Sequence, residues 1–185
     1  MEKNQEIIDF NHKQAYRNIK DIEIKVMEFV SKFDKDNLHE EDKKNLDVLL
    51  SAVRENVYAA KMIKDVKNDF NEFSESSSDT IHHIYDLIRR NLVYTILIYI
   101  NYMEKEWSSE KCMDKYHKAV EENSRIMGET TLSISKPGIN EKKVISLLNT
   151  NRSVAISSEA LFEASKAMNL YFPLAEDEEQ EEIAI

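Results

Sequence analysis

Apolar residues recur along most of the chain at alternating steps of three and four, the period of helices that bury one face. This pattern predicts five helices, at about residues 8–33, 39–73, 79–103, 110–132 and 140–171. The clearest break between them is Lys136-Pro137-Gly138, because proline removes a backbone donor. We therefore predict an all-α fold, an antiparallel bundle of about five long helices.

Apolar positions also predict which face of each helix is buried. On the first helix the buried seam includes Ile22, Val26, Phe29 and Phe33. On the third helix it is Ile81, Tyr85, Ile88, Leu92, Ile96, Tyr99 and Met103. Further apolar residues between positions 92 and 100 lie on the other faces of that helix. An apolar surface of this kind is expected to pack against another helix or a partner. We therefore predict a partner or self-association face there, with contact residues Leu92, Tyr94, Leu97 and Ile98.

The length and composition fit one compact domain followed by a tail. The chain has 185 residues with only two glycines and two prolines, too few turn-forming residues for a barrel, a sandwich or a wound sheet. Residues 1–173 are assigned to the bundle. Residues 174–185 are predicted to be a disordered acidic tail, because segment 176–182 holds six carboxylates and no cation.

Charge and cysteine content exclude several classes of protein. The formal net charge is -10, whereas a nucleic-acid-binding protein needs a basic surface. The single cysteine, Cys112, allows neither an intrachain disulfide nor a thiolate zinc site, which fits a reducing cytosolic compartment. The amino terminus lacks the apolar stretch of a secretory signal, and the longest apolar run, residues 92–100, is far shorter than the ~20 residues of a membrane span. We expect a cytoplasmic chain that does not cross a membrane by itself.

Acidic residues and histidines occur at three places with a spacing that permits metal binding from one helix face. These candidate ligands are Asp65 and Asp69; Asp79, His83 and Asp86; and Glu110, Asp114 and His117. The Glu-x-x-His pairs of di-iron bundles are absent from the chain. Solvated helix faces are therefore the favoured interpretation. A bundle protein or enzyme that binds divalent or iron ions at these clusters is the alternative.

One stretch of the chain resembles a known family. Residues 49–70, LLSAVRENVYAAKMIKDVKNDF, resemble the second helix of PhoU-like domains, in particular those at the cytoplasmic carboxyl end of bacterial Na+/phosphate cotransporter family proteins. Three shorter segments agree with the resemblance: YRNIK at 16–20, LHEE at 38–41 and SSSD at 76–79. It covers roughly residues 10–172 and is strongest over 46–73.

The resemblance implies a bundle of long antiparallel helices that regulates phosphate uptake and does not catalyse a reaction. PhoU proteins bind metal clusters through Glu/Asp-x-x-x-Asp motifs on their helices. By alignment on the second helix, Asp65 falls on the closing aspartate of that motif, but Lys61 stands where the family often has an acidic residue. Lysine removes a ligand there, so the pair Asp65 and Asp69 is the only local substitute.

We therefore predict a non-catalytic cytosolic module linked to Na+-dependent phosphate transport and phosphate homeostasis. Its expected place is the cytoplasm or the inner face of the membrane as part of a transporter. Its expected partner is a transporter membrane domain, another protein or a second copy of the chain. No catalytic or cofactor-binding residue is predicted. Two other functions stay open: the metal-binding bundle described above, and a general helical adaptor without a phosphate role.

Overall fold

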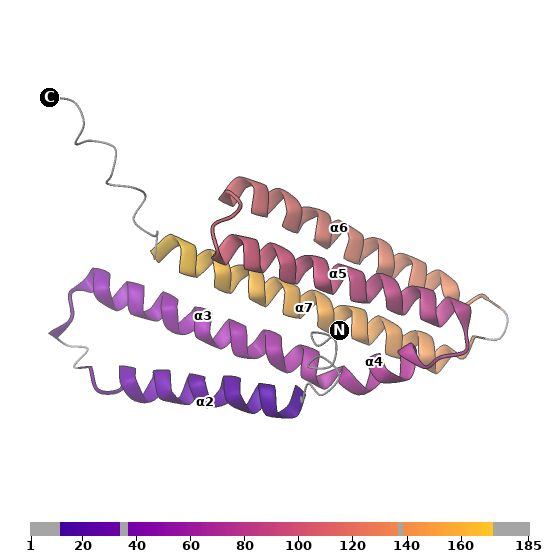
Figure 1. Ribbon diagram of the computed structural model, residues 1–185, viewed down its shortest axis with the longest axis horizontal. Helices are drawn as coiled ribbons and strands as arrows, with labels where there is room; N and C mark the ends of the chain where they lie inside the picture. The colour runs from indigo at the N-terminus through magenta and orange to yellow at the C-terminus, as the bar shows by residue number, and fades with distance from the viewer. Residues whose placement is uncertain (1–11, 34–36, 137–138, 172–185) are drawn as a thin grey trace, which may run out of the picture.

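The computed structural model describes residues 12–33, 37–136 and 139–171. Within them the chain forms six α-helices and no β-strand, which confirms the predicted all-α class. The helices are α2 (His12–Val30), α3 (Glu40–Asp65), α4 (Lys67–Ser74), α5 (Asp79–Met103), α6 (Ser109–Ser133) and α7 (Glu141–Tyr171). Figure 1 shows an elongated stack in which α6, α5, α7, α3 and α2 follow one another. The predicted acidic tail at 174–185 and the pair Pro137-Gly138 lie outside the described residues.

Several predicted helix boundaries are confirmed, and local capping accounts for two of them. The break predicted at 107–109 is present: α6 begins after Ser108, whose Oγ accepts a hydrogen bond from the Lys111 backbone N–H at 3.3 Å. Asn140 caps α7 in a similar way, since its Oδ1 accepts from the Lys142 N–H at 2.9 Å. Ser78 occupies the N-cap position of α5, but its side chain makes no capping bond.

The second predicted helix is wrong in one respect, because the structure divides it at Val66 into α3 and α4. Val66 has φ -96° and ψ 6°, which leaves helical geometry for one residue. The turn carries α4 onto α5 and α7. Phe73 is fully buried there, and Phe70 meets Tyr85 edge to face with ring centroids 5.8 Å apart. The apolar period continues through Val66, so the pattern carried no sign of the break.

Helix α7 is the central helix, since α3, α5 and α6 all pack along it. It is joined to α3 by the Ser157 hydroxyl, which donates to the Ala59 carbonyl at 3.0 Å. It is joined to α6 by the Asn151 amide, which donates to the Asn123 carbonyl at 3.2 Å. Its buried small residues are Ser157, Ser158, Ala160, Ala164 and Ser165. Small side chains let neighbouring helices approach closely, so α7 can be surrounded on several sides.

Helices α5 and α7, which pack against each other, run in the same direction. The early part of α5, at Ile84 and Ile88, shares a core cluster with Leu147 in the early part of α7. The late part of α5, at Tyr102, stacks on Phe162 in the late part of α7. The pair is parallel because α6 runs back to the end of the molecule where α5 begins, and α7 starts from that same end.

The core has two clusters of buried side chains, and both lie mainly among α5, α6 and α7. The first contains Phe73, Ile81, Ile84, Ile88, Ile126, Leu147 and Val154. The second contains Ile98, Tyr102, Cys112, Ala119 and Phe162. These three helices therefore supply most of the side chains of the two clusters.

Helix α2 lies at the edge of the stack and packs along α3 (Figure 1). Val30 is its buried apolar residue. Ile22, Phe29 and Phe33, which the pattern predicts inside a buried seam, are exposed. The prediction failed because a seam is buried only where another helix covers it, and among the described helices α2 packs closely along α3 only.

Candidate functional site

One face of α5 builds the core, and its positions recur every three or four residues. The buried residues of α5 are Ile81, Ile84, Ile88, Asn91, Thr95, Ile98 and Tyr102. They point toward α6 and α7: the Asn91 amide donates to the Ala119 carbonyl of α6 at 3.1 Å, and Tyr102 stacks on Phe162 of α7. This side of α5 has its partners within the chain.

The opposite face of α5 carries large apolar side chains in water. Its residues and their exposed fractions are Val93 at 50%, Ile96 at 39%, Leu97 at 48% and Ile100 at 39%. The spacing i, i+3, i+4, i+7 places all four on one stripe of the helix. We call this stripe the exposed α5 face. A contiguous apolar stripe on a helix that is otherwise well packed is a candidate binding surface for another protein.

The structure places the four residues predicted to contact a partner in different surroundings. Of the four predicted contact residues, only Leu97 belongs to the exposed α5 face. Ile98 is 1% exposed and lies in a core cluster, so it is not available to a partner. Leu92 packs against the cluster around Ile88, and Tyr94 packs against the cluster around Ile98.

Two buried polar residues explain why the buried face of α5 differs from the predicted one. Asn91 and Thr95 occupy core positions of α5, where a hydrophobic pattern does not predict them. Both are satisfied inside the protein: the Asn91 amide bonds the Ala119 carbonyl, and the Thr95 hydroxyl donates to the Asn91 carbonyl at 3.1 Å. Because the core includes polar positions, the buried face is rotated from the predicted stripe. Ile96 therefore lies in solvent.

Asp65 and Asp69 lie on different helices and have different partners. The Asp65 carboxylate accepts hydrogen bonds from the lysines around it, with its Oδ2 2.8 Å from Lys61 Nζ and its Oδ1 3.3 Å from Lys64 Nζ. The hydrogen bond from Lys61 lowers the pKa of Asp65. Asp69 lies beyond the break at Val66 and accepts a hydrogen bond from the Ser146 hydroxyl of α7 at 2.9 Å. Each carboxylate thus has its own partner.

The candidate ligands on α6 are exposed along its first turns. Glu110, Asp114 and His117 all face solvent. The Asp114 carboxylate is 2.7 Å from Lys118 Nζ, and this hydrogen bond lowers the pKa of Asp114. A lysine bound to the central carboxylate of the set competes with a metal ion for the same oxygens.

The cluster at the start of α5 is divided between different partners. His83 Nε2 lies 2.9 Å from a Glu129 carboxylate oxygen on α6. Asp86 pairs with Arg89 and Arg90 of its own helix, at 3.2 and 3.3 Å. Among the residues that the structure describes, no three His, Cys, Asp or Glu side chains come together as a metal site.

Cys112 is buried in the second core cluster. Burial raises the pKa of its thiol and outweighs the opposite effect of the neighbouring Lys111. The thiol points to a backbone carbonyl, that of Trp107, at 3.8 Å. A buried thiol with a raised pKa has the properties of a packing residue rather than a nucleophile.

A small polar cavity lies between α5, α6 and α7. Its volume is about 190 Å³, and Asn91, Tyr116, Asn123, Ser158 and Glu159 contribute to its wall. The Asn123 side-chain oxygen and the Ser158 hydroxyl are buried there without a hydrogen-bond partner in the described part of the chain. A cavity of this size and polarity has room for water molecules that satisfy both groups.

No family model, curated protein or solved structure matches the chain. The resemblance of residues 46–73 to PhoU-like domains therefore stays a prediction from the residues themselves. None of the described helices combines the length and the apolar character needed to cross a membrane.

Proposed function

We propose that this chain is a non-catalytic interaction module of the PhoU-like type, linked to Na+-dependent phosphate transport. The observation that carries the proposal is the exposed α5 face, four large apolar residues on a helix whose opposite side builds the core. Apolar surface held in water is stabilised when a partner covers it. The link to phosphate transport rests on the resemblance of residues 46–73, and an all-α chain is compatible with it.

The proposed partner is the cytoplasmic side of a transporter membrane domain, and the proposed effect of the contact is to regulate phosphate uptake. A module of this kind acts through the free energy of association, so its activity depends on a surface and not on a reacting group. Loss of the surface should then abolish regulation while the module stays folded.

The test is phosphate uptake by cells that lack this chain. We expect its deletion to change the initial rate of Na+-dependent uptake of radioactive phosphate, and the wild-type chain to restore that rate. Leu97→Asp should fail to restore it, because a carboxylate in the middle of the exposed α5 face opposes burial by a partner.

A matched variant separates loss of the surface from loss of the fold. Leu132 on α6 is 76% exposed and lies outside the exposed α5 face, so Leu132→Asp should restore uptake as the wild type does. Both variants should show the same helix content by circular dichroism. Unchanged uptake after deletion, or full rescue by folded Leu97→Asp, would contradict the proposal.

A further inference from the structure

An apolar groove lies between α2 and α3 and continues onto α7. Its volume is about 370 Å³, and its apolar wall is formed by Ala15, Ile19, Ala59, Ala60, Ile63 and Leu161. Three of these six residues are alanines, whose side chains are too short to fill the space between the helices. The groove is therefore a consequence of residue size along two facing helices.

Ser157 and Asn56, which border the groove, have hydrogen-bond partners within the protein. The Ser157 hydroxyl donates to the Ala59 carbonyl at 3.0 Å. The Asn56 amide donates to the Ala52 carbonyl at 2.9 Å, and its side-chain oxygen accepts from the Tyr99 hydroxyl at 3.4 Å. The buried polar atoms without partners in the described residues lie on other side chains, outside this groove. A hydrocarbon chain placed here would leave the hydrogen bonds of Ser157 and Asn56 intact.

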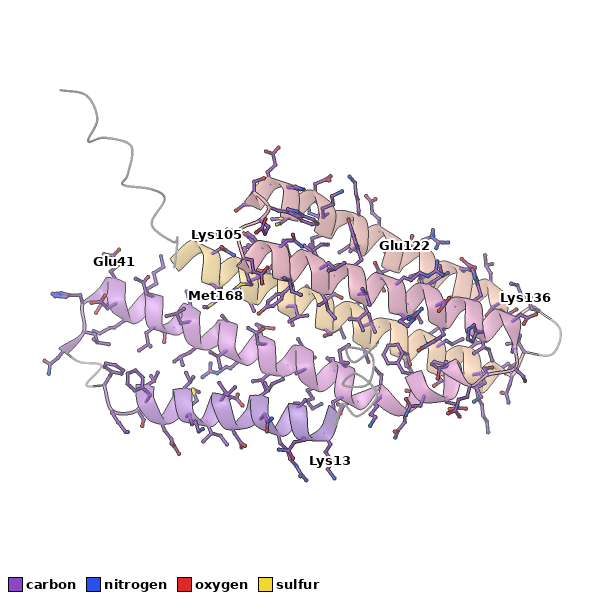
Figure 2. All side chains as sticks on the ribbon, viewed as in Figure 1. Lys13, Glu41, Lys105, Glu122, Lys136 and Met168 are labelled. Carbon is purple, nitrogen blue, oxygen red and sulfur yellow. The ribbon has the colours of Figure 1, made fainter. Side chains whose placement is uncertain are left out.

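One end of the groove is strongly basic. It adjoins a second cavity, of about 450 Å³, whose wall of described residues includes Lys13, Arg17, Lys64 and Lys67 and no carboxylate. Tyr16 and Lys64 belong to both cavities, and Lys64 Nζ lies 4.5 Å from the centre of the Tyr16 ring. Figure 2 shows Lys13 at the end of α2, beside the end of α3.

Within the described residues, the cations of this basic end are poorly matched by carboxylates. Lys64 has Asp65 at 3.3 Å, but the same carboxylate is held more closely by Lys61 at 2.8 Å. Lys13, Arg17 and Lys67 make no ion pair with the described residues. The chain as a whole has a net charge of -10, so this local excess of cations is a site where an anion is stabilised.

We propose that the groove binds a medium-chain fatty acid, with its carboxylate at the basic end and its alkyl chain against the alanines. The distance along α3 from Asn56 to Lys64 is about 12 Å, which an alkyl chain of about ten carbons spans. The carboxylate accepts hydrogen bonds from Lys64 and Arg17, and the chain leaves water. The groove is separate from the exposed α5 face, so fatty-acid binding there does not rest on the proposed function.

The first test compares three ligands by isothermal titration calorimetry on the full chain at neutral pH and low salt. Sodium decanoate should bind with one site per chain. 1-Decanol, with the same carbon count and no charge, should bind about tenfold more weakly or worse, and acetate should give no measurable binding. Added NaCl should weaken the binding of decanoate, because salt screens the cations. No binding of decanoate, or equal binding of decanoate and decanol, would overturn the proposal.

Two variants test the two ends of the groove separately. Lys64→Glu should weaken decanoate binding about tenfold or more, whereas Lys44→Glu, the same charge change on the exposed surface of α3 about 30 Å away, should not change it. Ala60→Phe should abolish binding by filling the groove. Decanoate affinity that survives Lys64→Glu or Ala60→Phe at the wild-type level would place the ligand elsewhere and overturn the assignment.

Hydrogen exchange locates the ligand without any substitution. Decanoate should slow amide exchange in residues 15–19 of α2 and leave α6 unchanged, because α2 forms one wall of the groove. Protection confined to α6, or spread evenly over the chain, would contradict the site. Flotation with vesicles of anionic phospholipid distinguishes a lipid surface: vesicle binding without decanoate binding would replace the fatty acid by a membrane.

Discussion

Two buried amides fix how α6 sits against its neighbours. The Asn91 amide of α5 donates to the Ala119 carbonyl at 3.1 Å, and the Asn151 amide of α7 donates to the Asn123 carbonyl at 3.2 Å. Apolar contacts tolerate a shift along the helix axis, whereas an amide reaches its carbonyl at one axial position only. These two bonds therefore set the register of α6 against both α5 and α7.

The Asn91 bond can be tested with its neighbour Thr95 as a control. Asn91→Ala should lower the free energy of unfolding by about 1–3 kcal/mol, because it removes the amide and leaves space in the core. Thr95→Val should change it by less than about 1 kcal/mol, since the Thr95 hydroxyl bonds only a carbonyl of its own helix. Urea denaturation followed by circular dichroism measures both values. Equal losses in the two variants would show that Asn91 has no special role.

Tyr116 predicts a loss of stability at alkaline pH. Burial, and then the nearby Glu159 and Glu163, raise its pKa from 10.0 to about 12. The unfolded chain releases this proton at lower pH than the folded chain, so the contribution is complete below about pH 10 and is lost as the pH rises toward about 12. Urea midpoints should therefore fall over this range in the wild type. They should fall less in Tyr116→Phe, and an identical pH dependence in both proteins would contradict the assignment.

At the scale of whole helices, the break at Val66 directs α4 into the core. Helix α2, by contrast, lies at the edge of the stack. Phe73 of α4 is fully buried, whereas Phe29 of α2 is 61% exposed. A phenylalanine therefore contributes different amounts to the free energy of unfolding on the two helices. Burial of a phenylalanine accounts for several kcal/mol of stability, and an exposed one contributes little.

This contrast can be measured with one substitution at each site. Phe73→Ala should lower the free energy of unfolding by about 3–5 kcal/mol, the usual cost of removing a buried phenylalanine. Phe29→Ala should lower it by less than about 1 kcal/mol. Thermal and urea unfolding give both numbers. A large effect at Phe29 would mean that another surface covers α2 in solution.

Helix boundaries could be predicted from the sequence far better than helix faces. Boundaries depend on nearby residues: Ser108 and Asn140 cap α6 and α7 with their own side chains. Faces depend on what lies opposite. Asn91 is buried and its amide reaches a carbonyl of α6, whereas Ile96 is exposed because none of the described helices covers it. The sequence therefore indicated the apolar excess at 92–100, but which of its residues are exposed depended on the arrangement of the other helices.

The groove beside α2 could not be predicted for the same reason. Lys64 and Lys67 are visible in the sequence as part of a basic strip, but Lys13 and Arg17 are about fifty residues away in the chain. Only the packing of α2 on α3 brings the four cations to one place. The alanines that form the groove carry no signal of their own, because alanine is common in buried helices.

At the scale of the whole molecule, stability is distributed unevenly over the stack. The two core clusters lie mainly among α5, α6 and α7, and α2 is attached along α3. Segments with few buried contacts open locally without global unfolding. The edge helix and the central helix should therefore report different free energies of opening.

Native-state hydrogen exchange measures this difference directly. Amides of α7 should exchange only through global unfolding, and amides of α2 should exchange faster by at least about a hundredfold. Low denaturant should leave the α2 rates almost unchanged and accelerate those of α7. Matching protection in the two helices would indicate that α2 and α7 unfold as one unit.

The position of the central helix in the chain has a consequence for synthesis. Helices α3, α5 and α6 all pack on α7, yet α7 leaves the ribosome after them. Translation adds roughly 5–20 residues per second. The apolar faces of the earlier helices therefore lack their main partner for seconds during synthesis. A nascent chain that stops before residue 141 keeps these faces open to chaperones and proteases. The order of helices thus gives the cell a means to remove incomplete copies, because only a chain that includes α7 can close its core.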